Sequence, residues 1–181
     1  LVKWKNHDVE DVEVELLLGA LKSRYGYDFT GYARASLKRR LKELTSYFGV
    51  KHLSELLSAM LYDEAVAQTM INSISVPTSE FFRDALVWKT VRDEVLPKLN
   101  SFPWINIWQV GCGRGEETYT LAILLHESGL LKKARLFSSD INPAFLKDAH
   151  SGCWPRRSMD AWRENYHASG GTGDFDSYFV K

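Results

Sequence analysis

Three glycines at alternate positions and two carboxylates stand together in the middle of the chain. They are Gly111, Gly113, Gly115, Glu116 and Glu117. Glycine allows the backbone to pass close to a ligand and to take angles that a side chain would forbid. A loop of this kind between a strand and a helix is typical of the start of a nucleotide-binding unit.

The spacing and charge of this loop distinguish between ligands. Dinucleotide-binding loops have the pattern G-x-G-x-x-G, whereas this loop reads G-x-G-x-G. Two carboxylates at the helix start would repel a pyrophosphate, but not a ligand with a cationic amino acid part. The pattern favours S-adenosylmethionine, which has no phosphate, over a nicotinamide cofactor. The alternative is a glycine turn in an unrelated α/β fold, whose carboxylates only favour the helix dipole.

An acid at the end of a second predicted strand supports the first interpretation. Residues 135–139 are expected to form a short strand that ends at Asp140, 25 residues beyond Gly115. At this place in a nucleotide-binding unit an acid usually holds the ribose hydroxyls. Asn142 and Pro143 are expected to begin the next helix, with proline at a favoured first position. The alternative is that Asp140 is only a turn residue.

The elements that must position these residues can be predicted around them. Residues 105–109 carry little polarity and are expected to be a buried strand of a parallel sheet. A helical segment over 118–128 follows the loop, and further helices are expected at 144–150 and 159–168. The last residues, 177–181, are expected to begin another strand. The predicted fold class is therefore α/β, with a Rossmann-like domain.

Composition limits the other functions. The chain has 181 residues, 45% hydrophobic and 25% charged, with a net charge of zero, which gives no global attraction to nucleic acid or membrane. Cys112 and Cys153 form neither a disulfide framework nor a metal-binding cluster, so no metal is expected. No transmembrane run or signal peptide is recognised, and a cytoplasmic location is the expectation.

The N-terminal part is predicted to be an all-helical bundle over residues 8–75. Apolar residues recur at helical spacing, and breakers separate the segments. Thr30 is a predicted N-cap and Gly49 a predicted helix end. The expected helices are 8–24, 32–48, 52–62 and 63–74.

One of these helices is unusually basic. It carries Arg34, Lys38, Arg39, Arg40 and Lys42, with no acid among them. One interpretation is a docking face for an acidic partner. The other, which charge alone supports equally, is a solvated helix surface.

A connector with two adjacent phenylalanines and Arg83 follows the bundle. Pro77 excludes a regular helix there. Asp84 is the predicted cap of a helix over 85–96, which Pro97 is expected to end. The phenylalanines are expected to form a hydrophobic plug between domains, and Arg83 to pair with a carboxylate or to reach a ligand.

These segments together resemble the CheR-type chemotaxis receptor methyltransferases, which are protein-glutamate O-methyltransferases. The resemblance covers residues 27–179 in the family's order. It is carried by YDFTGYARASLKRRL at 27–41, SEFFRD at 79–84, IWQVGCGRGEETYTLAILL at 107–125 and SSDINPAFLKDAHSGCW at 138–154. It implies methyl transfer from S-adenosylmethionine to glutamates on the cytoplasmic helices of chemotaxis receptors. The products would be glutamyl methyl esters and S-adenosylhomocysteine.

The resemblance also implies roles for individual residues. Arg83 would be the catalytic residue, near the cofactor carboxylate and the incoming glutamate. Arg34, Lys38, Arg39 and Arg40 would dock the receptor. The implied cofactor-binding residues are Ser79, Arg83, Gly111, Cys112, Gly113, Gly115, Glu116, Glu117, Asp140 and Ile141.

Some features depart from the family. Pro77 stands where the family has Asn, and Ser79 takes the place of Thr. The family's later motifs are absent, so the methyltransferase domain is expected to be incomplete, and pairing of two copies could cover its exposed sheet edge. The alternative function is a catalytically incomplete signalling or receptor-binding module. The expected domains are 8–75 for docking, 76–103 as connector and 104–181 for the partial methyltransferase domain.

Overall fold

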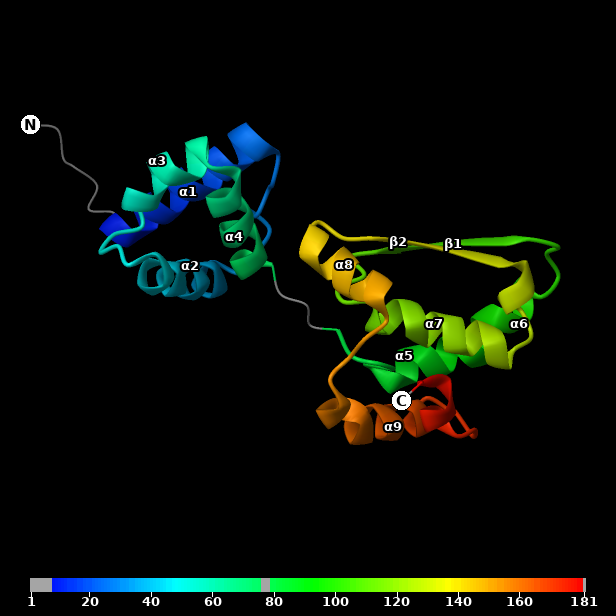
Figure 1. Cartoon of the computed structure of the whole chain (residues 1–181). Helices are drawn as coiled ribbons and strands as arrows, with labels where there is room; N and C mark the ends of the chain where they lie inside the picture. The colour runs from blue at the N-terminus through cyan, green and yellow to red at the C-terminus, as the bar shows by residue number, and fades with distance from the viewer. Residues whose placement is uncertain (1–7, 76–78, 181) are drawn as a thin grey trace, which may run out of the picture. The chain divides into compact units, whose positions relative to one another are not determined.

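The computed structural model describes residues 8–75 and 79–180. The chain divides into two compact units, residues 1–76 and residues 77–181 (Figure 1). The described connector residues, 79–84, belong to the second unit. Each unit has its own cluster of buried hydrophobic side chains.

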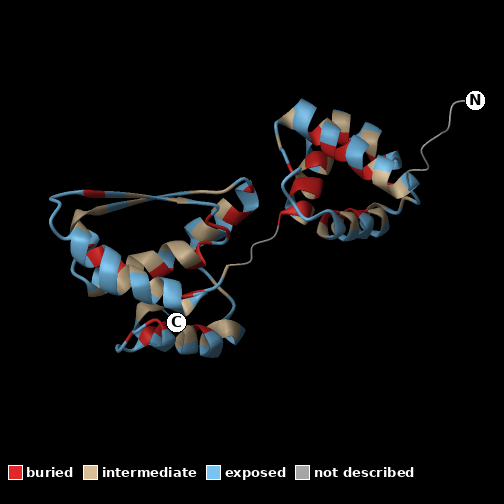
Figure 2. Cartoon of the chain, turned by 180° about the vertical axis from the view of Figure 1, so that it is seen from behind, coloured by how far each residue is buried: buried red, intermediate tan, exposed pale blue. Residues whose placement is uncertain are grey.

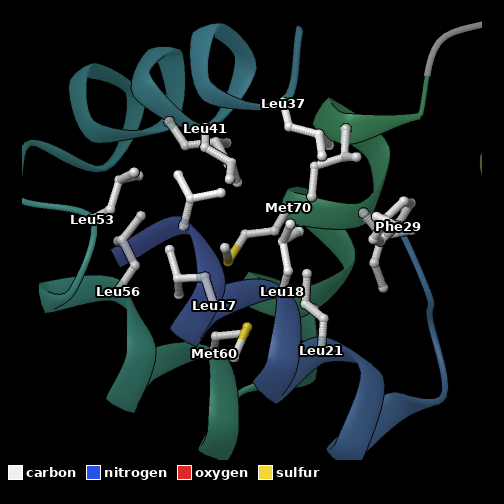
Figure 3. Close-up of a cluster of buried hydrophobic side chains, with 14 of the residues drawn as sticks. Leu17, Leu18, Leu21, Phe29, Leu37, Leu41, Leu53, Leu56, Met60 and Met70 are labelled. Carbon is white, nitrogen blue, oxygen red and sulfur yellow. The ribbon is translucent and has the colours of Figure 1, made fainter. Parts of the chain in front are cut away.

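The first unit is a bundle of helices, as the sequence predicts. Its core includes Leu17, Leu41, Met60 and Met70, all fully buried, and Figure 3 shows them directed toward one another. The tyrosine Tyr25 ties two helices together, because its hydroxyl donates to the carbonyl of Met60 at 2.7 Å. The helices are α1 (Val9–Tyr25), α2 (Arg34–Phe48), α3 (Glu55–Tyr62) and α4 (Glu64–Ile74).

For the basic helix, the predicted C-terminal end is correct and the predicted N-cap is wrong. Gly49 has the expected left-handed backbone, with φ of 70°, and its N–H donates to the carbonyl of Thr45. Thr30, however, does not cap the helix, which begins only after Ala33. The N–H and hydroxyl of Thr30 instead donate to Asp28 at 2.9 and 2.7 Å. The local turn therefore satisfies the threonine before the helix starts.

The second unit contains a two-stranded parallel sheet with helices packed against it. The strands pair in register from Ile105 with Ala134 to Val110 with Ser139. This arrangement, after an all-helical unit, confirms the predicted α/β class. The elements are α5 (Ala85–Thr90), a π-helical turn η1 (Val91–Val95), α6 (Leu96–Leu99), β1 (Ile105–Val110), α7 (Glu116–Glu127), η2 (Leu131–Lys133), β2 (Ala134–Ser139), α8 (Pro143–Ser151), η3 (Arg156–Ser158), α9 (Met159–Ala168) and η4 (Phe175–Tyr178).

The two faces of the sheet differ in burial. Ile105 is buried and Ile107 is partly buried in the core that includes α7. Residues of alternate positions lie on the opposite face of a strand. There, Trp108 and its register partner Phe137 are 69% and 53% exposed. Figure 2 shows the two strands mostly in the colours of exposed and intermediate residues. The sequence prediction of a strand buried on both faces is therefore wrong for the described residues.

Three further local predictions fail. Pro97 does not end its helix, because the wide π-helical turn before it continues into α6, where proline occupies a first-turn position that needs no N–H. Asp84 precedes α5 but makes no side-chain cap, since its own backbone is left-handed. Residues 175–178 form the short 3₁₀ helix η4 instead of leading into a strand. Residue 181 lies outside the described part of the chain.

The paired phenylalanines fill the core of the second unit. Phe81 and Phe82 are both fully buried. Phe81 contacts the Trp162 ring with centroids 4.9 Å apart, and Phe82 contacts Tyr166 at 5.2 Å. The expected plug is thus an internal one, which anchors the connector onto α9.

Candidate functional site

The glycine-rich loop leaves β1 with left-handed backbone angles. The φ values of Gly111, Gly113 and Gly115 are 73°, 55° and 95°, in the region that favours glycine. The N–H groups of Gly111 and Cys112 both donate to the carbonyl of Ser139, at 2.8 and 2.9 Å. The loop is therefore fastened to the carboxyl end of β2, which is where parallel sheets of this class bind ligands.

Asp140 lies against the loop, as its sequence position predicts. Its Oδ2 accepts a hydrogen bond of 2.8 Å from the N–H of Gly113, and its Oδ1 accepts one of 2.8 Å from the N–H of Asn142. Each carboxylate oxygen retains a further lone pair for a ligand hydroxyl. Ile141, which follows, is 43% exposed. Asn142 caps α8 through the N–H of Ala144, so the prediction of this helix start is confirmed.

Gly115 is needed for space as well as for backbone angle. A Cβ placed on it would lie 2.9 Å from the Cβ of Ala149 on α8. The neighbouring Arg114 reinforces the same contact, because its Nε lies 3.4 Å from Asp148 Oδ2 and its carbonyl accepts from the indole of Trp154 at 3.1 Å. A Cβ on Gly111, in contrast, would meet nothing within 4 Å. The loop is thus closed toward α8 and open at its first glycine.

The two glutamates at the start of α7 have different surroundings. Glu116 is 6% exposed, and its Oε2 has no hydrogen-bond partner in the described structure. Burial raises the pKa of this carboxyl, against a smaller opposing effect of the backbone N–H of Glu116 itself. The hydroxyl of Ser79 is also buried and without a hydrogen-bond partner among the described residues. Glu117 accepts a hydrogen bond of 3.1 Å from the amide of Gln109.

The Cys112 thiol is not a nucleophile in this arrangement. The residue is 1% exposed. Burial, together with the negative charge of Asp140, raises the pKa of the thiol. The thiolate is the reactive form of cysteine, so the environment suppresses its reactivity. Cys112 is therefore a packing residue of the loop.

The connector that carries Arg83 has an unusual backbone. Phe82 and Asp84, on either side of Arg83, have φ values of 53° and 54°. A bulky residue in this region is an outlier that the surroundings must stabilise. The N–H of Phe82 donates to the Thr120 hydroxyl on α7 at 3.0 Å, and the carbonyl of Phe81 accepts from the Asn165 amide on α9 at 3.2 Å. Sequence reasoning gave no role to Thr120, which lies within the family stretch 107–125, or to Asn165.

The residues at the loop fit S-adenosylmethionine in their chemistry. Glu116 and Glu117 provide carboxylates for a cationic amino acid end, and Asp140 provides one for hydroxyls. The unpartnered polar atoms of Ser79 and Glu116 are buried acceptors or donors beside the loop. No group of three or more His, Cys, Asp or Glu side chains that could hold a metal occurs within residues 8–75 and 79–180.

A second open space lies away from the glycine-rich loop. It is a cleft of about 1070 Å³ lined by residues of α7, of α9 and of the segment 175–180. Trp154, Trp162 and Phe179 give it an aromatic lining, and Met159, Arg156 and Arg163 also line it. None of the loop glycines lines this cleft, so we distinguish it from the nucleotide-type site.

The basic residues of α2 divide into those with partners in the bundle and those without. Arg34 lies 3.0 Å from Glu15, and Lys38 lies 2.6 Å from Asp11, both on α1. Arg40 donates to the carbonyls of Ser73 and Ile74 at the end of α4. The side chains of Arg39 and Lys42 are exposed and make no hydrogen bond or ion pair with any described residue. Three of the four predicted docking residues thus have partners within the bundle.

The described helices include none that is long and apolar enough to cross a membrane.

The first unit is a helical bundle, and the second is a nucleotide-binding type of α/β domain with its loop at the carboxyl ends of the strands. These two features define the class of the protein, a cofactor-binding domain preceded by a helical one.

Comparison with known proteins identifies the family. The SAM-binding domain of the CheR methyltransferases matches residues 77–178, and their all-alpha domain matches residues 13–75. The chain belongs to the CheR methyltransferase family. The second unit is accordingly its S-adenosylmethionine-binding domain, and the recognition made from the sequence motifs is confirmed.

Individual relatives agree with this assignment. A putative methyltransferase, Cher3, of Pseudomonas putida is 39% identical over 94% of this chain, which spans 62% of that protein. A chemotaxis protein methyltransferase of Listeria innocua is 30% identical over 95% of this chain, which spans 67% of it. A probable biofilm formation methyltransferase, WspC, of Pseudomonas aeruginosa is 25% identical over 77% of this chain and 34% of its own length.

Proposed function

We propose that the protein containing this chain methylates glutamate side chains of chemotaxis receptors, with S-adenosylmethionine as methyl donor. The observation that carries the proposal is the contact between Asp140 and the N–H of Gly113, which joins the predicted ribose-binding acid to the glycine-rich loop. Family membership supports the methyl transfer. Relatives named chemotaxis protein methyltransferases support receptors as substrates.

Within this proposal, the loop residues bind the cofactor. Asp140 and Ile141 would lie at the ribose, and Gly111, Cys112, Gly113 and Gly115 would shape the pocket. Glu117 would meet the ammonium. Glu116 and Ser79 are buried beside it and would form the floor of that end of the pocket. The pocket needs no metal to hold a ligand that carries no phosphate.

Catalysis would depend mainly on orientation. When bound, S-adenosylmethionine supplies a methyl group on a positively charged sulfur, so a carboxylate needs no general base to react with it. The protein has to align the carboxylate and exclude water, and orientation alone can lower a barrier substantially. Arg83 would bind the cofactor carboxylate and orient the incoming glutamate, since guanidinium groups bind carboxylates in a fixed geometry. Its side chain is 45% exposed and therefore accessible to a substrate.

Receptor docking would use the exposed part of the basic helix. Arg39 and Lys42 are the cations of α2 whose side chains are exposed and have no partner among the described residues, whereas Arg34, Lys38 and Arg40 contact other parts of the bundle. Acidic receptor helices would be attracted to such a face, mostly through the rate of association. The protein would act in the cytoplasm, where these receptor segments lie.

The test is transfer of labelled methyl from S-adenosylmethionine to a receptor cytoplasmic fragment. The protein containing this chain should form base-labile methyl esters, and Arg83→Ala should abolish them while the circular dichroism spectrum stays unchanged. Receptor binding without methyl transfer would instead favour a binding module. Unchanged turnover in Arg83→Ala would exclude the role given to this arginine.

A further inference from the structure

The backbone of the connector is held in a strained shape at Phe82. Phe82 combines a left-handed φ of 53° with complete burial of its ring. Such a conformation costs free energy and persists only if its neighbours determine it. The ring itself contacts Trp88, Tyr166 and Phe175, but aromatic packing does not fix the direction of the N–H group.

Thr120 is the group that fixes this direction. It is fully buried on α7, one helical turn after Glu116. Its hydroxyl accepts the N–H of Phe82 at 3.0 Å and donates its own hydrogen to the carbonyl of Glu116 at 2.8 Å. One hydroxyl therefore joins the strained connector to the first turn of the helix that follows the glycine-rich loop.

We propose that Thr120 is a positioning residue for Arg83. Holding the N–H of Phe82 fixes the backbone from which the next residue projects. It does so relative to the start of α7, where Glu116 and Glu117 lie. The proposal rests on the proposed function for the role of Arg83, but the restraint on Phe82 is a property of the chain itself.

Asn165 holds the connector from the other side but cannot replace Thr120. Its amide donates to the carbonyl of Phe81, which precedes the strained residue, and it belongs to α9. The link to α9 anchors the connector to the core. The link through Thr120 sets its position relative to the candidate cofactor site.

The matched variants are Thr120→Val, which keeps the shape and removes the hydroxyl, and Thr120→Ser, which keeps the hydroxyl. Amide hydrogen exchange at Phe82 measures the restraint directly. Exchange in Thr120→Val should accelerate by roughly tenfold to a hundredfold, since a buried N–H loses its acceptor. Thr120→Ser should restore protection. Wild-type protection in Thr120→Val would overturn the proposal.

The route through Arg83 is tested with S-adenosylhomocysteine and a double-mutant cycle. Thr120→Val should weaken binding in the wild-type background but have little further effect in Arg83→Ala. Equal weakening in both backgrounds would overturn the positioning role. Absence of binding by the wild-type protein would instead count against the proposed function, and the exchange result at Phe82 would then decide the restraint alone.

Discussion

Gly115 shows how a single position combines two constraints. Its φ of 95° disfavours a side chain, and α8 occupies the space that a Cβ would need. Gly129, at the end of α7, has a φ of 73° and open space around it. Comparing substitutions at Gly115 and Gly129 therefore separates the cost of backbone strain from the cost of the steric clash with α8.

Gly129→Ala should lower the free energy of unfolding by about 1 to 2 kcal/mol, the usual cost of a left-handed alanine. Gly115→Ala should cost about 1 to 3 kcal/mol more, because α8 must shift. Urea denaturation measures both. Equal losses of unfolding free energy in the two variants would mean that Ala149 can move away from the new Cβ without destabilising the fold.

Glu116 predicts a dependence of stability on pH. Because burial raises its pKa in the folded state, the folded protein binds this proton more tightly than the unfolded chain does. Its contribution to stability should therefore fall as pH rises from the ordinary value of about 4.5 through the folded value.

Glu116→Gln removes this titration, so its stability relative to wild type should increase over that pH window. Denaturation at a series of pH values measures the difference. Glu164→Gln, at an exposed position of α9, is the control and should follow the wild-type profile. Parallel profiles for Glu116→Gln and wild type would show that the carboxyl is not sensitive to its burial.

Sequence reasoning could place Asp140 beside the glycines because both follow strands of one parallel unit. It could not find Thr120, since a threonine within an apolar helix has no distinctive spacing. Its role arises only when the connector, 38 residues earlier, folds against α7. Nor could charge alone separate Arg39 from Lys38, whose partner Asp11 lies on another helix.

At the scale of helices and strands, local sequence patterns predicted those elements whose bounds depend on local interactions. The helix over 159–168 has the expected bounds, and the strand predicted over 105–109 continues for one more residue, to Val110. The prediction that Pro97 ends its helix was wrong because a π-helical turn changes the hydrogen-bond pattern before it. No sequence pattern predicts this turn. The strand predicted over 177–181 does not form in its described part, because residues 175–178 form the 3₁₀ helix η4 and the sheet of the described chain consists of β1 and β2.

The basic helix yields a prediction about docking. Reversing Arg39 and Lys42 to glutamate should weaken binding of a receptor fragment by about tenfold at low salt, with less effect at high salt. Lys38→Met should lower thermal stability, because it removes the contact with Asp11, and should change binding little. Calorimetric titration and thermal unfolding measure the two effects. Equal loss of binding in both variants would contradict the division of the cations.

The whole molecule consists of two units with separate cores, so the first should fold alone. Residues 8–75 should give a helical spectrum and a cooperative thermal transition. Leu41→Ala, at a fully buried position, should lower the free energy of unfolding by about 2 to 5 kcal/mol. Leu16→Ala, at a 53% exposed position, should change it by less than about 0.5 kcal/mol. A gradual, non-cooperative transition would mean that the bundle depends on the second unit.

The central claim, that the glycine-rich loop and Asp140 form an S-adenosylmethionine site, is tested most directly by calorimetric titration with S-adenosylhomocysteine. The wild-type chain should bind with a dissociation constant in the micromolar range. Asp140→Asn should weaken binding by about tenfold or more, because it removes a charged acceptor. Arg156→Ala, beside the separate cleft, should bind as wild type does. Failure of the wild-type chain to bind, or equal affinity in Asp140→Asn, would contradict the account.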